Sequence, residues 1–373
     1  MRHSMLLAWI GCGAMLVATG CGKPSQEYGI RLELRETSLG GLPQPPAWMT
    51  PERLKVSPDS RHVAWFHQGS LRIDGRQIGR FDNGIGPSLE FSPDSRHLVC
   101  LGYVMQQGKR RFAIAVDGRP GPAYDKISHE IWRGLGIRYG TFNADGSRYR
   151  YRAEQDGKPL HVTVDLDTGK HVESDRPPDE PAWEDPTPKP RVSDKPPPGF
   201  KVDPESEHRP SWYVSSPDGK RVVCWVRGGE GIYCVVDGNV APPGKFRERV
   251  VFSADSRRVA YVARTKDGGR IVVDGRGGPV WKYLINRQEP AFSPDGRYVA
   301  YMAPQNEDVL RRGWVILVND LRTGTYDSAL IRHGARILFD GPDALHTIMV
   351  RDGEALLVEV NIIPDPSAPK PPE

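Results

Sequence analysis

A phrase of about ten residues recurs along the chain and restricts it to a repeat architecture. The copies read VSPDSRHVAW (56–65), FSPDSRHLVC (91–100), FNADGSRYRY (142–151), SSPDGKRVVC (215–224), FSADSRRVAY (252–261), FSPDGRYVAY (292–301) and a divergent DGPDALHTIM (340–349). Their aspartates are Asp59, Asp94, Asp145, Asp218, Asp255, Asp295 and Asp343. When the Pro-rich residues 174–210 are set aside, these aspartates lie about 41 residues apart on average, the spacing of propeller blades with four strands each.

Each copy predicts a tight turn followed by a buried strand. Pro, Asp and Gly or Ser favour the turn, and the Asp side chain caps backbone N–H groups in it. Large and small apolar residues then alternate, as expected for a strand pressed between two sheets. A second phrase predicts a hairpin: LRIDGR (71–76), AIAVDGR (113–119), YCVVDGN (233–239) and RIVVDGR (270–276). The 40 glycines and 35 prolines exclude a helical bundle and suit short strands joined by turns.

The two phrases together resemble the TolB-type, WD-like propeller repeats of bacterial envelope proteins, over roughly residues 50–361. The resemblance implies an all-β fold, a seven-bladed β-propeller with four antiparallel strands per blade, and six blades are the alternative. It implies no activity, because the shared residues are turn formers. Residues 22–50 are too short for the N-terminal domain of TolB, so a role in the Tol system does not follow.

The N-terminal region supplies a strand that no repeat contains. The last repeat accounts for strands near 336–339, 345–350 and 355–361 but lacks a fourth strand. Residues 29–36 alternate polar and apolar side chains and belong to no repeat. We predict that they form the outer strand of the last blade, because closing the ring removes a free sheet edge. The alternative is that they belong to a disordered tether.

The chain opens with a predicted signal peptide, residues 1–20. Arg2 and His3 precede an apolar run over 5–17, which is too short to span a hydrocarbon core of ~30 Å. The sequence Ala18-Thr19-Gly20-Cys21 resembles a bacterial lipobox, which implies lipidation of Cys21 and membrane anchoring outside the cytoplasm, at the bacterial cell envelope. Gly22 favours the periplasmic face of the outer membrane. The alternative is cleavage near Ala18 with an incidental cysteine.

The remaining boundaries follow from composition. Residues 21–28 are a predicted lipid-anchored tether, 29–361 the propeller, and 362–373 a Pro-rich disordered tail. The Pro-rich insert 174–210 carries 11 prolines, nine acidic and six basic residues. This composition predicts a disordered polar segment.

The loops of one propeller rim provide a candidate binding surface. In a propeller the recurring turns share one rim, so the longer connections share the other, where binding usually occurs. Those connections carry Arg110, Arg111, Trp132, Arg311 and Arg312, and Arg beside aromatic residues is typical of interfaces. We expect a monomer whose partner is an unidentified envelope protein, peptide or glycan, and Trp314 to belong to the core.

No catalytic motif is evident. G-x-S-x-G and H-E-x-x-H are absent, and the net charge of +4 does not indicate nucleic-acid binding. His62, His97 and His346 share one repeat position, which reflects repeat ancestry, and residues 165–169 predict a hairpin turn although they faintly resemble a calcium loop. We therefore predict no catalytic residue, metal or cofactor. The alternative is a propeller enzyme, or a small-ligand or sugar receptor that uses the central channel.

Two features are specific to single repeats. Cys224 and Cys234 flank the sequence RGGEG symmetrically, so they are candidates for a disulfide across a hairpin, with two buried thiols as the alternative. Arg150 occupies a between-blade position that holds Ala, Val or Ile in other copies. Because a lone buried guanidinium is costly, we predict a polar or wet seam beside the third blade.

Overall fold

The computed structural model describes residues 29–43, 53–81, 85–132, 136–176, 213–228, 231–237, 239–240, 250–265, 267–282, 284, 289–305 and 313–365. Its strands form seven antiparallel sheets of four or five strands, which we number in chain order, and one two-stranded sheet. The all-β prediction is therefore confirmed. Among the described residues, no helix is long and apolar enough to cross a membrane.

Each of the seven sheets is built mainly from strands consecutive in the chain. The first holds β2 (Leu54–Val56), β3 (Val63–His67), β4 (Ser70–Ile73) and β5 (Arg76–Arg80). The second holds β6 (Ile85–Phe91), β7 (Leu98–Gln106), β8 (Lys109–Val116) and β9 (Arg119–Pro120). The third holds β10 (Lys126–Ile127), β13 (Gly140–Phe142), β14 (Arg148–Gln155), β15 (Lys158–Asp165) and β16 (His171–Ser174). Between β10 and β13 lies the two-stranded sheet of β11 (Glu130–Trp132) and β12 (Gly136–Arg138).

The second half of the chain repeats this plan. The fourth sheet holds β17 (Tyr213–Ser215), β18 (Val222–Gly228), β19 (Gly231–Val236) and β20 (Asn239–Val240). The fifth holds β21 (Val250–Phe252), β22 (Val259–Thr265), β23 (Gly268–Val273) and β24 (Arg276–Gly277). The sixth holds β25 (Ala291–Phe292), β26 (Val299–Pro304), β27 (Trp314–Val318) and β28 (Leu321–Arg322). The seventh holds β29 (Ser328–Ala329), β30 (Leu338–Gly341), β31 (Ala344–Arg351), β32 (Glu354–Pro364) and β1 (Ile30–Gly41), with the 3₁₀ helix η1 (Leu330–His333) after β29.

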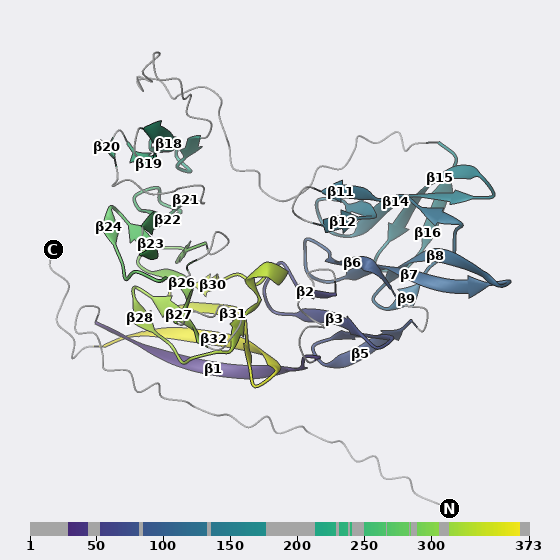
Figure 1. The fold of residues 1–373 in the computed structure, drawn as a ribbon, viewed down its shortest axis with the longest axis horizontal. Coiled ribbons are helices and arrows are strands. Elements are labelled where there is room, and N and C mark those ends of the chain that lie inside the picture. The colour runs from purple at the N-terminus through teal and green to yellow at the C-terminus, as the bar shows by residue number, and fades with distance from the viewer. Residues whose placement is uncertain are drawn as a thin grey trace, which may run out of the picture.

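Neighbouring sheets pack face to face through shared apolar clusters. Val63 and Trp65 of β3 join a cluster with the seventh sheet, whereas Ala64 and Phe66 join one with the second sheet. Comparable clusters join the second and third, fourth and fifth, fifth and sixth, and sixth and seventh sheets. Figure 1 shows the resulting arc, with the fourth and third sheets at its two ends. In the first sheet, alternating residues of the second strand thus pack against both neighbouring sheets.

The third sheet departs from this pattern on the side away from the second sheet. Tyr149 and Tyr151 of β14 are buried against the second sheet. The residues that alternate with them are polar: Arg148, Arg150 and Arg152 on β14, and His161, Thr163 and Asp165 opposite them on β15. Arg150 is half-buried and Arg152 is exposed. The predicted polar side of the third sheet is therefore present, and it cannot merge with an apolar core as the other faces do.

The N-terminal strand completes the seventh sheet, as predicted. β1 pairs antiparallel with β32 from Ile30 opposite Pro364 to Gly41 opposite Glu354. Ile30, Leu32 and Leu34 pack on the cluster of the sixth and seventh sheets. The pairing extends past the predicted boundaries, because β1 continues beyond residue 36 and β32 beyond residue 361. The tail predicted from 362 therefore starts too early, since Ile362 is a buried core residue.

Polar contacts and a close backbone approach fix β1 in place. The Glu36 carboxylate accepts two hydrogen bonds from the Arg351 guanidinium at 2.5 and 2.8 Å, and one from the Tyr326 hydroxyl at 2.7 Å. Gly40 has φ +102, and a Cβ there would lie 2.6 Å from the Cα of Gly75 in the first sheet. Only glycine fits this approach, which joins the end of β1 to the first sheet.

Candidate functional site

The recurring turns form one polar rim, which we call the turn rim: the turns between first and second strands and the Asp-Gly turns between third and fourth strands. In the first sheet, Ser57 Oγ accepts the His62 N–H at 2.9 Å and Asp59 Oδ1 accepts the Arg61 N–H at 3.1 Å. The aspartate caps a backbone N–H likewise at Asp94, Asp145, Asp218, Asp255 and Asp295. The predicted capping is confirmed at these six positions.

The seventh turn aspartate has another role. Asp343 Oδ1 accepts a hydrogen bond of 2.9 Å from Arg297 of the sixth sheet. It therefore joins two sheets, whereas the other six aspartates stabilise their own turns. This difference agrees with the divergence of the last copy, in which Gly341 stands where the other copies have Ser or Asn two residues before the aspartate.

The aspartate of the second phrase contacts the first residue of the second strand and the side chain of the residue just before that strand. This role was not expected from the sequence. Asp74 Oδ1 accepts the Val63 N–H at 2.9 Å, and Asp74 Oδ2 lies 2.6 Å from His62 Nδ1. The same two contacts recur at Asp117, Asp237 and Asp274. They confirm that both kinds of turn share one rim. The sequence contains a pattern that could have predicted these contacts, because a His or Arg recurs immediately before each of these strands.

Serine hydroxyls extend the turn rim from sheet to sheet. The Asp59 N–H donates to Ser95 Oγ of the second sheet at 3.0 Å, and the Asp218 N–H donates to Ser256 Oγ of the fifth at 3.1 Å. The Arg336 N–H of the seventh sheet donates to Ser60 Oγ of the first at 3.0 Å. All three serines have positive φ. Glycine would adopt this conformation with less strain, but serine is used because its hydroxyl accepts a backbone N–H from the adjacent sheet.

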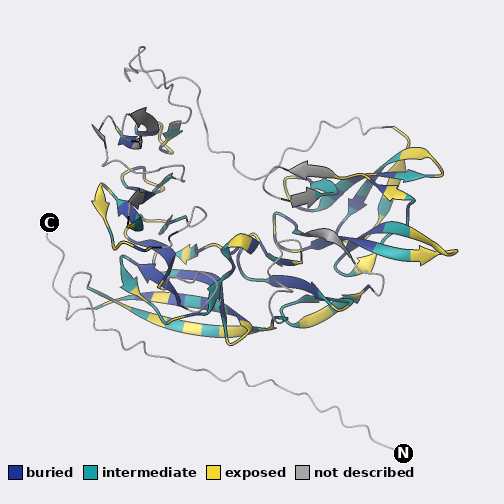
Figure 2. Ribbon diagram, in the orientation of Figure 1, coloured by how far each residue is buried: buried dark blue, intermediate teal, exposed yellow. Residues whose placement is uncertain are grey.

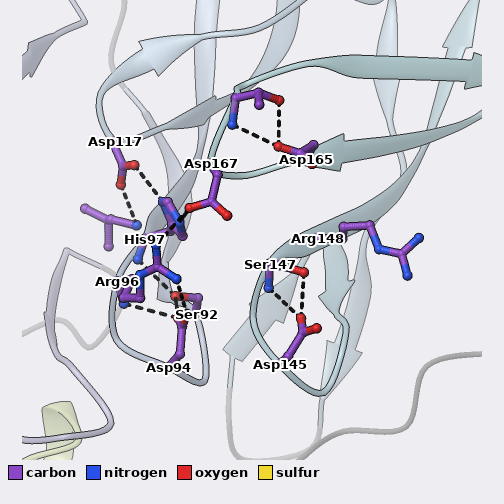
Figure 3. A network of polar contacts seen from close by, with 12 residues as sticks. Ser92, Asp94, Arg96, His97, Asp117, Asp145, Ser147, Arg148, Asp165 and Asp167 are labelled. Atoms are coloured by element: carbon purple, nitrogen blue, oxygen red, sulfur yellow. Dashed lines mark hydrogen bonds and ion pairs between the residues drawn. The ribbon is translucent and has the colours of Figure 1, made fainter.

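Figure 3 shows the turn rim where the second and third sheets meet. Arg96 Nη2 donates to Asp167 Oδ1 at 2.9 Å, across the junction. Asp165 Oδ1 accepts the N–H and hydroxyl of Thr168 at 2.9 and 2.6 Å. Residues 165–169 thus form the predicted turn between β15 and β16. Within the described residues, no group of three or more His, Cys, Asp or Glu side chains is arranged to hold a metal ion.

The chemistry of the turn rim is that of a structural network. Hydrogen bonds from the Ser216 hydroxyl and the Lys220 N–H lower the pKa of Asp218, and those from Ser253 and Arg257 lower the pKa of Asp255. Such carboxylates stay ionised and are poor proton carriers at neutral pH. The turn rim therefore holds its sheets together and offers no general acid or base at these aspartates.

On the opposite rim, the β7–β8 hairpin extends past the strands beside it; we call residues 103–112 the projecting hairpin. β6 pairs with β7 only as far as Gly102, whereas β7 and β8 pair as far as Gln106 opposite Lys109. Exposed residues form its tip (Figure 2). The Arg110 guanidinium lies 5.1 Å from the centre of the Tyr103 ring, and Met105 beside it is 52% exposed. A cation, an aromatic ring and an apolar side chain are thus presented together.

The other residues of the predicted binding surface differ in their positions. Arg111 donates to Gln155 at 3.0 Å and lies 3.4 Å from Asp125, so it holds the projecting hairpin against the third sheet. Trp132 pairs with Gly136 in the two-stranded sheet, and its side chain lies outside the described residues, as do Arg311 and Arg312. Trp314 is a buried core residue, as predicted. Cys21 and most of the insert also lie outside the described residues.

The proposed disulfide between Cys224 and Cys234 is wrong, because both are free thiols. Gly228 pairs with Gly231, which places Cys224 opposite Val235 and Cys234 opposite Trp225. A shift of one residue puts the two side chains on opposite faces of the sheet: Cys234 packs toward the fifth sheet and Cys224 with Val222 and Val235. Burial raises the pKa of Cys224 to about 11 and that of Cys234 to about 12, so both are unreactive.

Comparison with known proteins yields matches among solved structures alone. No protein-family model and no curated protein matches the sequence. TolB from Acinetobacter baumannii is similar at 16% identity and a TM-score of 0.23, over 82% of this chain and 62% of that one. The Cps50 (Swd1) β-propeller domain of Myceliophteria thermophila is similar at 13% identity and a TM-score of 0.27, over 87% of this chain and 99% of that one.

A putative TolB from Agrobacterium tumefaciens is also similar, at 15% identity and a TM-score of 0.21, over 90% of this chain and 99% of that one. TolB proteins and a β-propeller domain are thus among the structures that this chain resembles. The chain spans less than two thirds of the length of the Acinetobacter protein. The fold assignment rests on the seven sheets and their pairing, and the similarity assigns no activity, ligand or partner.

Proposed function

We propose that this protein is a non-catalytic binding scaffold: a seven-bladed propeller, closed by β1 and held at the bacterial cell envelope by a lipid on Cys21. The projecting hairpin is the observation that supports a binding role. The turn rim uses its polar groups to join sheets, whereas Tyr103, Met105, Lys109 and Arg110 stand on a hairpin that extends beyond its neighbours. Variable segments on a rigid scaffold are the usual place for recognition.

The composition of the projecting hairpin favours a partner that presents carboxylates. Lys109 and Arg110 are both exposed at its tip. The stacking of Arg110 on Tyr103 orients the guanidinium before binding, so little side-chain entropy is lost when a carboxylate pairs with it. Met105 offers an apolar contact beside these charges. The partner class that fits is an envelope protein or peptide with an acidic surface, and a glycan bearing carboxylates is the next that fits.

Charge reversal at the tip tests this proposal. The double variant Lys109→Glu, Arg110→Glu is expected to weaken partner capture from solubilised envelopes by about 30-fold or more, as for the loss of an interface anchor worth about 2 kcal/mol. Capture by the unaltered protein is expected to weaken as salt is raised. The melting temperature is expected to stay unchanged, because both side chains are exposed.

A matched change on the turn rim is the control. Arg119→Glu, Arg276→Glu alters two exposed arginines beside Asp-Gly turns and is expected to leave capture intact. If the control variant loses the partner and the hairpin variant retains it, binding belongs to the turn rim and the proposal is wrong.

The lipid anchor is tested separately. Cys21→Ser is expected to move the protein from the membrane fraction to the soluble extracytoplasmic fraction, because several acyl chains at ~0.8 kcal/mol per buried CH₂ supply the anchoring. Mass spectrometry of the mature chain should show the matching loss of acyl mass. Cys12→Ser, a change within the predicted signal, is the control and should leave the protein in the membrane fraction. A Cys21→Ser protein that remains in the membrane would contradict anchoring through this cysteine.

A further inference from the structure

The outer edge of the seventh sheet is formed by an unusually long strand. β1 has 12 residues, whereas the outer strands of the other six sheets have five or fewer. Within the described residues β1 pairs with β32 alone, and in Figure 1 it runs along the lower margin of the molecule. Proline, a bulge or a short strand commonly protects such an edge, but residues 30–38 contain no proline and pair with β32 in one unbroken register. This edge can therefore accept another strand.

The pairing of β1 with β32 decides which of its backbone groups face outward. In an antiparallel pair, residues that exchange hydrogen bonds alternate with residues that do not. The Asp365 N–H donates to the Gly29 carbonyl at 2.7 Å, so every second residue counted from Gly29 bonds to β32. The N–H and C=O groups of Leu32, Leu34 and Glu36 therefore point away from β32. They form the ladder that a further strand would meet.

The side chains of β1 alternate in the same way. Arg31, Glu33 and Arg35 are exposed on one face of the strand, whereas Leu32 and Leu34 are half-buried on the other face against the cluster of the sixth and seventh sheets. Figure 2 shows this alternation of exposed and intermediate residues along β1. A row of charges of one sign would repel a second copy of the strand. The signs along β1 alternate instead, so a second copy can pair with it.

The charges select one register for such a pair. When two copies of β1 run antiparallel with Leu34 opposite Leu34, each Glu33 lies opposite Arg35 of the other copy. A pairing centred on Glu33 or on Arg35 places like charges opposite each other, and one centred on Leu32 leaves the later residues of β1 unpaired. Leu34 is also the midpoint of 30–38, the stretch that pairs regularly with β32. We propose that two copies of this chain associate through β1, antiparallel and centred on Leu34.

The contacts that these charges already make do not oppose the pairing. The Arg31 guanidinium lies 3.0 Å from the Glu33 carboxylate, and that of Arg35 lies 3.8 Å from the Glu359 carboxylate. The side chains of Arg31, Glu33 and Arg35 are 63%, 50% and 65% exposed. Ion pairs this exposed contribute little to stability. Glu33 and Arg35 can therefore exchange them for contacts with the second copy.

The association is expected to be weak and to depend on concentration. Residues 30–38 of each copy are fewer than the roughly 20–30 residues a side that a typical stable interface contains. At low concentration the chain is thus the monomer expected from the sequence, and the dimer forms as concentration rises. The alternation of charge provides specificity more than strength.

Charge reversal on β1 tests the register in the full chain. Glu33→Arg and Arg35→Glu each place like charges opposite each other at two positions of the dimer. Each variant is expected to raise the dissociation constant of its own dimer about tenfold or more. In an equimolar mixture, the chain with two arginines faces the chain with two glutamates, so association should return to the strength of the unaltered protein. Sedimentation velocity over a range of concentrations measures all four samples.

Arg31→Glu is the matched control. Arg31 is as exposed as Arg35, but in the proposed register it lies opposite Thr37, which is uncharged. The control is expected to change the dissociation constant by less than about twofold. A loss of association as large as that from Arg35→Glu would contradict the register and with it the proposal.

Cysteine cross-linking detects the same pair even when it is short-lived. In the proposed register, residues 33 and 35 of the two copies form a non-hydrogen-bonded pair with Cα atoms about 4.5 Å apart, within the range of a disulfide. Glu33→Cys mixed with Arg35→Cys should therefore cross-link under mild oxidation. Each variant alone places its two new cysteines diagonally, about 7–8 Å apart, and should cross-link poorly. Cys100, Cys224 and Cys234 are buried and do not compete.

Two results would overturn the proposal. One is a mixture of the cysteine variants that does not cross-link although the unaltered protein dimerises, because the dimer then uses another surface. The other is an unaltered protein that sediments as a monomer at every concentration, together with a mixture that does not cross-link. None of these measurements uses partner capture or the projecting hairpin, so the dimer and the proposed binding function succeed or fail separately.

Discussion

Deleting residues 29–41 is expected to lower the free energy of unfolding by about 5 kcal/mol or more. The deletion uncovers Val358, Val360 and Ile362 of β32, each of which is at most 2% exposed. Full burial of such a side chain stabilises by about 1.5–3 kcal/mol, and the loss of β1 also leaves β32 as an unpaired edge. Thermal and denaturant unfolding of the truncated and full chains would measure the effect. An unchanged melting curve would show that β1 does not close the fold.

Point variants separate the strand's packing from mere chain shortening. Leu34→Asp directs a charge at the cluster that Leu34 packs against and is expected to destabilise strongly. Thr37→Asp, on the exposed side of the same strand, is the control and should have a small effect. Equal effects of the two changes would contradict the register in which β1 pairs with β32.

Replacing Ala300 by Arg is expected to prevent stable folding. Ala300 is 0% exposed and lies in the cluster that joins the sixth and seventh sheets. A guanidinium there would be buried among apolar side chains with no carboxylate to pair with it, which costs on the order of 4 kcal/mol or more. Ala300→Val, the residue that the second and fourth sheets use at this position, should cost about 1–3 kcal/mol through overpacking. Denaturant unfolding monitored by tryptophan fluorescence distinguishes these outcomes.

The reverse change in the third sheet is expected to be mild. Arg150 occupies the same repeat position as Ala300 but is half-buried on a polar face, beside Thr163 and near Arg152. Arg150→Ala should change the free energy of unfolding by about 1 kcal/mol or less. A loss as large as that from Ala300→Arg would show that Arg150 belongs to a tightly buried ion pair and that the face of the third sheet is closed to water.

Some features of the candidate sites could be predicted from the sequence, because they depend on local chemistry. The turn aspartates, the burial of Trp314 and the pairing of β1 were predictable, because turn propensity and strand alternation are properties of neighbouring residues. The role of Arg111 was not, since it depends on Asp125 and Gln155, which the fold brings to it from another sheet. The partners of His97 and His346 escaped prediction for the same reason, because the fold brings Asp167 to His97 and Arg61 to His346 from neighbouring sheets.

The sequence by itself determined that this chain forms repeated antiparallel sheets, where each sheet turns, and that its first strand completes its last sheet. Period and turn residues are sufficient for that, because they specify backbone conformation locally. Tertiary structure alone decided the register that separates Cys224 from Cys234 and the partners that Arg111, His97 and His346 meet. A slip of one residue reverses a side chain's face, and contacts between sheets depend on how the faces stack, which no local pattern encodes.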